Sequence, residues 1–185
     1  LSYGKQAVQN NANSFVGFGQ FNDRIRDELI KGGLSGASEK SWISNTNANT
    51  TIMENLISGI KGITKNAAFE MADPDKTVTY VTCHDNYTLY DRFKAAGITD
   101  ETMVKQMAML ANSVVFTSQG TSFMLAGEEF LRTKQGNNNS YNSTYEVNEL
   151  DYSLKVKHLD MFTNYQKLIE LKQTVDGLHL GKDEN

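Results

Sequence analysis

The stretch "VTYVTCHDNYTLYDRF", residues 78–93, decides the fold. It begins with the β-branched and aromatic residues that favour a buried strand, Val78 and Val81 among them. It then ends on two neighbouring polar residues, His84 and Asp85, before a segment with helical spacing starts. A strand that stops on such groups is typical of α/β proteins, where functional side chains follow the carboxyl ends of the strands.

The rest of the chain predicts further alternation of strands and helices. Apolar runs predict two more strands, at 14–21 and 121–127. Periodic segments predict helices at 22–32, 49–63, 86–97, 100–120 and 153–173. Such alternation predicts parallel strands joined by right-handed crossovers.

Apolar stripes on these helices indicate which faces are buried. Ile25, Leu29 and Ile30 are expected on one face, as are Ile52, Leu56 and Ile60, which are spaced by four. The longest helix carries a stripe that we expect in the core rather than at a cofactor. It consists of Met103, Met107, Leu110 and Val114.

Length and charge restrict the class of protein. A chain of 185 residues with 39% apolar residues is expected to form one compact domain. Its formal charge of -4 argues against nucleic-acid or anionic-lipid partners, and no apolar run reaches the roughly 18 residues of a membrane helix. The start at Leu1 shows neither an initiator Met nor a signal-peptide core, so we expect that it is not a natural start. A neutral or small polar ligand fits this composition best.

Several cofactor chemistries are disfavoured by spacing. "GFGQFN" begins like a dinucleotide fingerprint, but Asn22 stands where the third glycine belongs. A thiolate dyad of Cys83 and His84 is disfavoured because adjacent strand residues point to opposite faces, which predicts Cys83 in the core. The three histidines lack zinc-site spacing. We therefore expect no cofactor and no metal.

Polar side chains follow all three predicted strands and are expected to converge on one mouth. They are Asn22, Asp23 and Arg24, then His84, Asp85 and Asn86, and then Glu128 and Glu129 before the Asn-rich loop. Amides, carboxylates and a phenol of this kind suit neutral sugar hydroxyls, which both donate and accept hydrogen bonds. The alternative is that Asp85 caps a helix and that "NNNSYNS" is a mobile polar loop. The residues alone leave both interpretations open.

Three segments resemble a known family. "YVTCHDNYTLYDRF" resembles the α-amylase superfamily motif in which a strand ends in His-Asp. "FMLAGEEFLRTKQGNNNSYNSTYEVNELDY" resembles the segment after the last barrel strand of pullulanases, the α-1,6-debranching members, and "GFGQFNDRIRDELIKGG" is similar to their sixth-strand segment. The three segments occur in the family's order.

The resemblance implies a (β/α)8 TIM barrel, with the three strands here as the sixth, seventh and eighth. A whole barrel needs about 250 residues, so residues 1–175 are expected to be the C-terminal portion of a catalytic domain. Residues 176–185 are expected to be a tail towards a downstream domain. The family's nucleophilic Asp and acid/base Glu would lie upstream of the matching region. This chain then holds only the third family carboxylate.

The resemblance also assigns roles to single residues. Asp85 is the transition-state stabiliser, and His84 binds the same glucose. Asn139 and Tyr141 line the neighbouring donor-side sugar. Asn22, Asp23 and Arg24 contact the acceptor side, with a structural ion pair with Arg26 or Asp27 as the alternative. The position of Glu128 and Glu129 is structural in the family.

The implied function is part of a retaining glycoside hydrolase that cleaves α-1,6-glucosidic linkages in pullulan, starch or glycogen-type glucans. The isolated chain is expected to be inactive, because one carboxylate cannot serve as nucleophile and acid/base together. The alternative is a noncatalytic carbohydrate-binding or purely structural fragment. The expected partners are an α-glucan and either a second copy of the chain or the missing part of the barrel, which would cover the open sheet.

Overall fold

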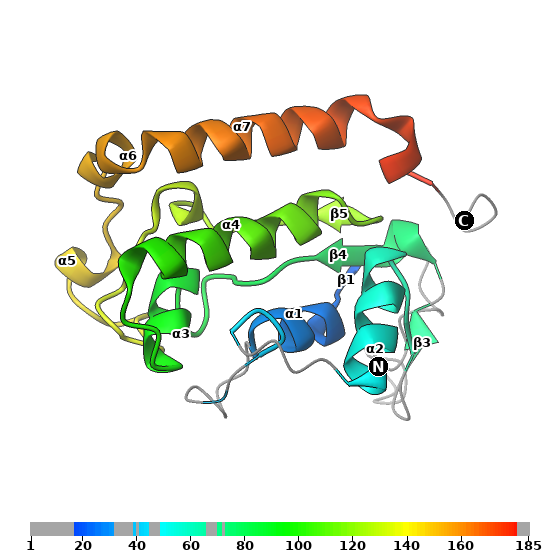
Figure 1. Ribbon diagram of the computed structural model, residues 1–185, viewed down its shortest axis with the longest axis horizontal. Coiled ribbons are helices and arrows are strands. Elements are labelled where there is room, and N and C mark those ends of the chain that lie inside the picture. The colour runs from blue at the N-terminus through cyan, green and yellow to red at the C-terminus, as the bar shows by residue number, and fades with distance from the viewer. Residues whose placement is uncertain are drawn as a thin grey trace, which may run out of the picture.

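A three-stranded parallel sheet with helices packed around it forms the centre of the molecule (Figure 1). The computed structural model describes residues 17–31, 39, 41–44, 49–65, 70, 71 and 73–180. The sheet contains β1 (Gln20–Phe21), β4 (Thr77–Thr79) and β5 (Thr121–Ser122), in the order β1-β4-β5. Both pairs are parallel, which confirms the arrangement expected from the alternating pattern.

The strands are shorter than the sequence predicted. Gln20 pairs with Thr77, and Val78 pairs with Thr121, so the ladder spans only two or three residues of each strand. Beyond Thr79 the chain leaves the ladder and bends at residues 84–86. The predicted strand at 14–21 was therefore too long in its described part, while residues 14–16 lie outside the described residues.

Two buried threonines and one glycine fix the close approach of β4 and β5. The Thr77 hydroxyl donates to the Gly62 carbonyl oxygen at 2.5 Å, and the Thr79 hydroxyl donates to the Gln119 carbonyl oxygen at 3.1 Å. Gly120 has a φ of +80°, and a Cβ added there would lie 2.6 Å from the Thr77 carbonyl oxygen. Any side chain at this position would force the two strands apart.

The first two helices pack directly on each other through a glycine. Helix α1 (Asp23–Ile30) begins after the Asn22 cap, and α2 (Thr50–Ile60) begins after the Asn49 cap. A Cβ added at Gly59 would lie only 2.8 Å from the Cβ of Ile25. The absence of a side chain at this position therefore allows the two helices to touch.

The predicted buried face is right for α1 and partly wrong for α2. Ile25, Leu29 and Ile30 are all buried. On α2, Leu56 is buried but Ile60 is 41% exposed. The contact at Gly59 turns the buried face of α2 away from a strict spacing of four.

A pair of short antiparallel strands lies between α2 and β4, where the sequence analysis predicted no strand. It pairs β2 (Thr64–Lys65) with β3 (Glu70–Met71). A 3-10 turn, η3 (Pro74–Lys76), then leads into β4. The sequence analysis did not find these strands because two-residue strands carry almost no periodic signal.

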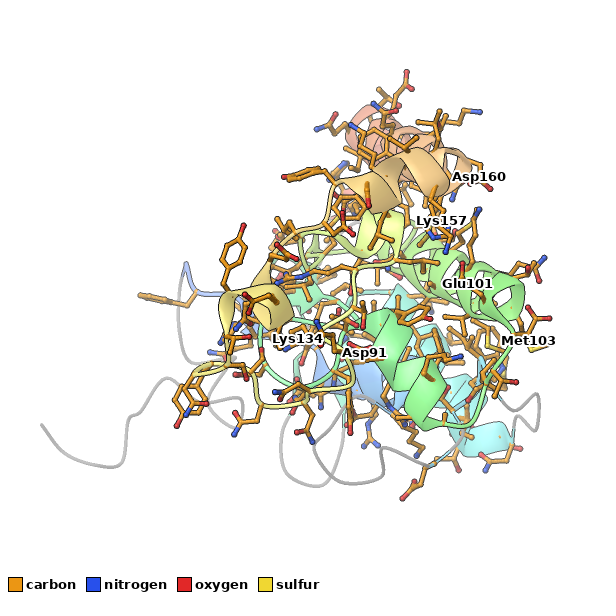
Figure 2. All side chains as sticks on the ribbon, turned by 90° about the vertical axis from the view of Figure 1, so that its left-hand side faces the viewer. Asp91, Glu101, Met103, Lys134, Lys157 and Asp160 are labelled. Carbon is orange, nitrogen blue, oxygen red and sulfur yellow. The ribbon has the colours of Figure 1, made fainter. Side chains whose placement is uncertain are left out.

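The long helix α4 (Glu101–Phe116) packs against α3 (Leu89–Ala95) and lies along α7 (Leu159–Thr174) (Figure 1). The predicted core stripe on α4 is partly wrong. Met103, labelled in Figure 2, and Leu110 are each 45% exposed, whereas Met107 and Val114 are partly buried against the core. Small residues form part of the buried face instead. The buried residues of α4 are Val104, Ala108, Ala111, Asn112, Val115 and Phe116.

The C-terminal segment follows the loop after β5. That loop contains the 3-10 turn η4 (Glu128–Phe130) and the short helix α5 (Tyr145–Asn148). The predicted last helix is divided at His158 into α6 (Ser153–Lys157) and α7, and η5 (Asp176–Leu178) follows. Among the described residues, no helix combines the length and apolar character needed to cross a membrane.

Candidate functional site

The turn after β4 carries the two polar side chains that the sequence singled out. The chain bends at residues 84–86, and Asn86 adopts a positive φ of 65° that completes the turn. The side chains of His84 and Asp85 are 86% and 72% exposed, and His84 Nε2 lies 3.4 Å from Asp85 Oδ2. The turn thus presents an imidazole and a carboxylate together to solvent.

The same bend overturns the prediction that Cys83 and His84 face opposite sides. The Cys83 sulfur, a His84 ring nitrogen and an Asp85 carboxylate oxygen all lie within 4.8 Å of one another. Cys83 is also only half-buried, so the prediction of a plain core residue was wrong. Burial raises the pKa of its thiol, and the nearby Asp85 charge raises it further. The alternation of side chains holds only while a strand stays extended.

Thr88, and not Asp85, caps the helix that follows. The Thr88 hydroxyl accepts a hydrogen bond from the Asp91 backbone N–H at 3.2 Å, and α3 begins at Leu89. The helix-cap alternative for Asp85 is therefore wrong. The Asp85 carboxylate is left facing solvent beside His84.

A buried junction behind the turn holds the next two strand-end loops together. The Asp91 carboxylate accepts hydrogen bonds from the Thr88 hydroxyl at 2.7 Å, the Thr133 hydroxyl at 2.6 Å and the Lys134 backbone N–H at 2.6 Å. The Lys134 ammonium donates to the His84 carbonyl oxygen at 3.1 Å. Asp91 and Lys134 lie side by side in Figure 2. The loop after β5 thus supports the turn after β4.

Sequence analysis missed this junction, although one local signal was present. Thr88 and Asp91 have the spacing of a helix-capping pair, in which the residue three positions on returns toward the cap. That pattern identifies Asp91 as an ordered carboxylate. Its partners Thr133 and Lys134 are more than 40 residues away, and no local pattern predicts them.

The residues after β1 serve mainly local structure. Asn22 is fully buried, and its side-chain oxygen accepts from the Ile25 backbone N–H at 3.3 Å as the cap of α1. Arg24 lies 4.0 Å from Glu28 on the next turn. The structure therefore does not bring Asn22 to the exposed turn, and it gives Arg24 an ion-pair partner within α1.

Polar and aromatic side chains near the ends of the three strands contact one another. The Tyr80 hydroxyl donates to Asp23 at 2.6 Å, and Arg26 donates to both Asp23 and Tyr80, at 3.1 Å and 2.5 Å. Burial, followed by the hydrogen bond to Asp23, raises the pKa of Tyr80. The Tyr80 ring also lies 4.5 Å from the Phe21 ring and 6.4 Å from the Phe123 ring, between centroids.

The Asn-rich loop is internally hydrogen-bonded. Asn137 donates to the Ser143 hydroxyl at 2.9 Å, and Asn148 donates to the Ser140 carbonyl oxygen at 2.8 Å. Asn139 is exposed, and Tyr141 is 83% exposed. The loop therefore presents an amide and an aromatic ring from a cross-linked backbone, with Lys134 at its start contacting the His84 carbonyl.

Glu128 and Glu129 do not form an exposed carboxylate pair. Glu128 is buried and accepts from the Asn112 side chain at 3.1 Å, while Glu129 accepts from the Gly127 backbone N–H at 2.8 Å. Burial raises the pKa of Glu128 to about 8. Glu128 Oε1 and Asn112 Oδ1 have no hydrogen-bond partner among the described residues. A neutral carboxyl group carries an O–H that can donate a hydrogen bond, which an ionised carboxylate lacks.

The exposed groups suit a neutral polyhydroxylated ligand. His84 and Asp85 offer a donor and an acceptor on a turn that buried hydrogen bonds support, and Tyr141 offers an aromatic face. Sugar rings combine hydroxyl groups with an apolar face and therefore fit this combination.

Comparisons with known proteins agree with this chemistry. No protein-family model matches the chain. It is 29% identical over 174 residues to the pullulanase of Bacillus subtilis (strain 168), which covers 94% of this chain and 24% of that relative. The chain therefore spans about a quarter of the length of this relative.

Solved pullulanase structures extend the similarity to the fold. The pullulanase of Paenibacillus barengoltzii, solved with maltohexaose and α-cyclodextrin, superposes with a TM-score of 0.87 at 34% identity, covering 96% of this chain and 28% of that one. The pullulanase of Anoxybacillus sp. LM18-11, solved with maltotetraose, gives a TM-score of 0.86 at 32% identity, covering 97% and 25%. These matches show that the chain is similar in sequence and in fold to about a quarter of the length of solved pullulanases.

Proposed function

We propose that this chain is part of a retaining, pullulanase-type glycoside hydrolase that cleaves α-1,6-glucosidic linkages. In this proposal β1, β4 and β5 are the sixth, seventh and eighth strands of a (β/α)8 barrel. Their parallel pairing in chain order supports this correspondence, since neighbouring barrel strands pair in sequence order. Residues 1–175 then form the C-terminal part of the catalytic domain, and residues 176–185 lead towards a further domain. The longer protein that would contain this chain is called the parent protein below.

The paired exposure of His84 and Asp85 on one supported turn is the observation that carries the proposal. Asp85 would stabilise positive charge that develops on the glucose ring in the transition state and accept hydrogen bonds from its hydroxyls. His84, 3.4 Å away, would bind the same ring. The nucleophile and the acid/base would come from the other part of the barrel.

The residues around this turn take supporting roles. Asn139 and Tyr141 would contact the donor-side sugar, because the loop that presents them begins at Lys134, which touches the His84 carbonyl oxygen. Arg24 would contact the acceptor side only if it leaves Glu28, from which it is 4.0 Å away. Asn22 is buried as a helix cap, so we assign it a positioning role.

Hydrolysis of pullulan tests the proposal directly. The parent protein should release maltotriose from pullulan, because cleavage of its α-1,6 linkages separates the maltotriose units. The chain of 185 residues alone should release no reducing sugar above the uncatalysed rate. A parent protein that leaves pullulan intact while binding it would support the noncatalytic alternative, which the similarity to pullulanases does not favour.

A further inference from the structure

We propose that Cys83, His84 and Asp85 form a binding site for a thiophilic divalent cation of the zinc type. The possible ligand atoms of these three residues all lie within 4.8 Å of one another. His84 Nε2 and Asp85 Oδ2 are already 3.4 Å apart. Ligands bound tetrahedrally at about 2.0–2.3 Å are separated by roughly 3.3–3.8 Å, so small side-chain rotations complete the site.

The backbone holds these three consecutive residues in a chelating conformation. An extended strand would place His84 on the opposite face from Cys83 and Asp85. The bend at residues 84–86, with its positive φ at Asn86, brings all three side chains to one side. The Lys134 ammonium donates to the His84 carbonyl oxygen at 3.1 Å and so fixes the middle of the turn. Much of the ordering cost of binding is therefore already met by the fold.

The charges around the site favour a dication that replaces a proton. Cys83 is a free cysteine, and its thiol lies beside the Asp85 carboxylate. On binding, the metal–sulfur bond forms as the S–H bond breaks, and the proton leaves to solvent. A dication with one thiolate and one carboxylate gives a neutral group.

Two neighbouring cations weaken the site without preventing it. Lys134 and Arg26 both act electrostatically on Cys83. Lys134, however, donates to the His84 carbonyl, and Arg26 donates to Asp23 and Tyr80. We therefore expect weaker binding than in a closed site with four protein ligands.

The ligand types select the metal. Thiolate and imidazole ligands favour Zn²⁺ and Cd²⁺, whereas Ca²⁺ and Mg²⁺ require oxygen ligands. Because His84 and Asp85 are open to solvent, water completes the coordination. The site is therefore an exchangeable, three-ligand site.

Absorption spectroscopy of the parent protein tests metal binding without any reference to catalysis. Titration with Cd²⁺ should produce sulfur-to-metal charge-transfer absorption that reaches one equivalent, measured as the difference from the Cys83→Ser variant. Loss of even an outer-shell partner typically costs about 10–100-fold in metal affinity, so His84→Gln and Asp85→Asn should each weaken Cd²⁺ binding at least tenfold. His179→Gln, which removes an exposed histidine elsewhere, is the matched control and should leave binding unchanged.

Two results would overturn the metal site. One is the absence of any absorption difference between the parent protein and Cys83→Ser at millimolar Cd²⁺. The other is undiminished affinity in both His84→Gln and Asp85→Asn, which would show that the thiol binds alone. His84 is exposed, so its substitution tests the site even if Cys83→Ser lowers the yield of folded protein.

A competition experiment links the site to the proposed function, on which this last step rests. If His84 and Asp85 contact a glucose ring, maltotriose should lower the apparent affinity of the parent protein for Cd²⁺. Zn²⁺ should also inhibit pullulan hydrolysis by the parent protein, and it should inhibit the Cys83→Ser variant much less. Spectroscopic Cd²⁺ binding that maltotriose does not affect would support the metal site and count against the glucan assignment of these two residues.

Discussion

The exposed turn at residues 83–86 and the buried junction behind it use the same chemical group in opposite ways. Asp85 is 72% exposed and has His84 as a neighbour at 3.4 Å. Asp91 is 4% exposed and accepts hydrogen bonds from Thr88, Thr133 and Lys134. The Asp85 carboxylate can therefore still accept hydrogen bonds from a ligand. The Asp91 carboxylate already accepts hydrogen bonds that join two loops. Burial and partners, and not residue type, decide which of the two carboxylates is available to a ligand.

The largest expected effect is on turnover. Asp85→Asn in the parent protein keeps the size of the side chain but removes the charge that a positive transition state needs. We expect kcat on pullulan to fall about 100–1000-fold, roughly 3–4 kcal/mol, with a smaller change in KM. Steady-state kinetics measures this, with Asp176→Asn as an exposed control that should retain full turnover. Unchanged kcat in Asp85→Asn would remove the proposed role.

Asp91→Ala should show the opposite pattern. It leaves the Lys134 backbone N–H and two hydroxyl groups without their acceptor in a buried place. We expect a loss of about 3 kcal/mol in the free energy of unfolding. Urea unfolding measures this, and kcat per folded molecule should fall far less than in Asp85→Asn. A stable Asp91→Ala protein with strongly reduced kcat would break the division between the two carboxylates.

Glu128 is a third carboxylate to compare with Asp85 and Asp91. It is buried like Asp91 but accepts fewer hydrogen bonds. Burial raises its pKa from 4.5 to about 8, so the folded state holds a proton that the unfolded state releases between these values. Stability should therefore decrease as pH rises from about 4.5 to about 8, and this contribution should not change further above that window.

Glu128→Gln tests this dependence. Glutamine has the same shape and no proton to lose, so the variant should lack this part of the pH dependence. Local hydration of the carboxylate limits the difference to about 1–2 kcal/mol at the alkaline end. Urea unfolding at several pH values measures this difference in stability between Glu128→Gln and the unchanged protein. Glu129 is retained in both proteins. Identical slopes for both proteins would show that Glu128 is ionised throughout.

Tyr141→Ala should have the smallest effect. Loss of an exposed ring that stacks on a sugar is expected to cost about 0.5–1.5 kcal/mol, seen as a rise in KM for pullulan with little change in kcat. Tyr145, on the same loop and 75% exposed, supplies the matched control. Equal KM values for Tyr141→Ala and Tyr145→Ala would show that neither ring is specific to the donor-side sugar.

Local sequence patterns determined the alternation of elements, the parallel sheet and the buried face of α1. They also placed His84 and Asp85 after β4, although that strand ends at Thr79 and the two residues lie in the turn that follows it. The resemblance to pullulanases likewise came from contiguous segments, and the comparisons support it.

Tertiary structure alone decided where these local choices met. The contact of α4 with α3 and α7 left Met103 exposed, and the bend after β4 brought Cys83 to the same side as His84. The partners of Asp91 come from more than 40 residues away. A sequence pattern fixes a periodicity, but which face is buried, and which carboxylate remains free, depends on groups that only folding brings into contact.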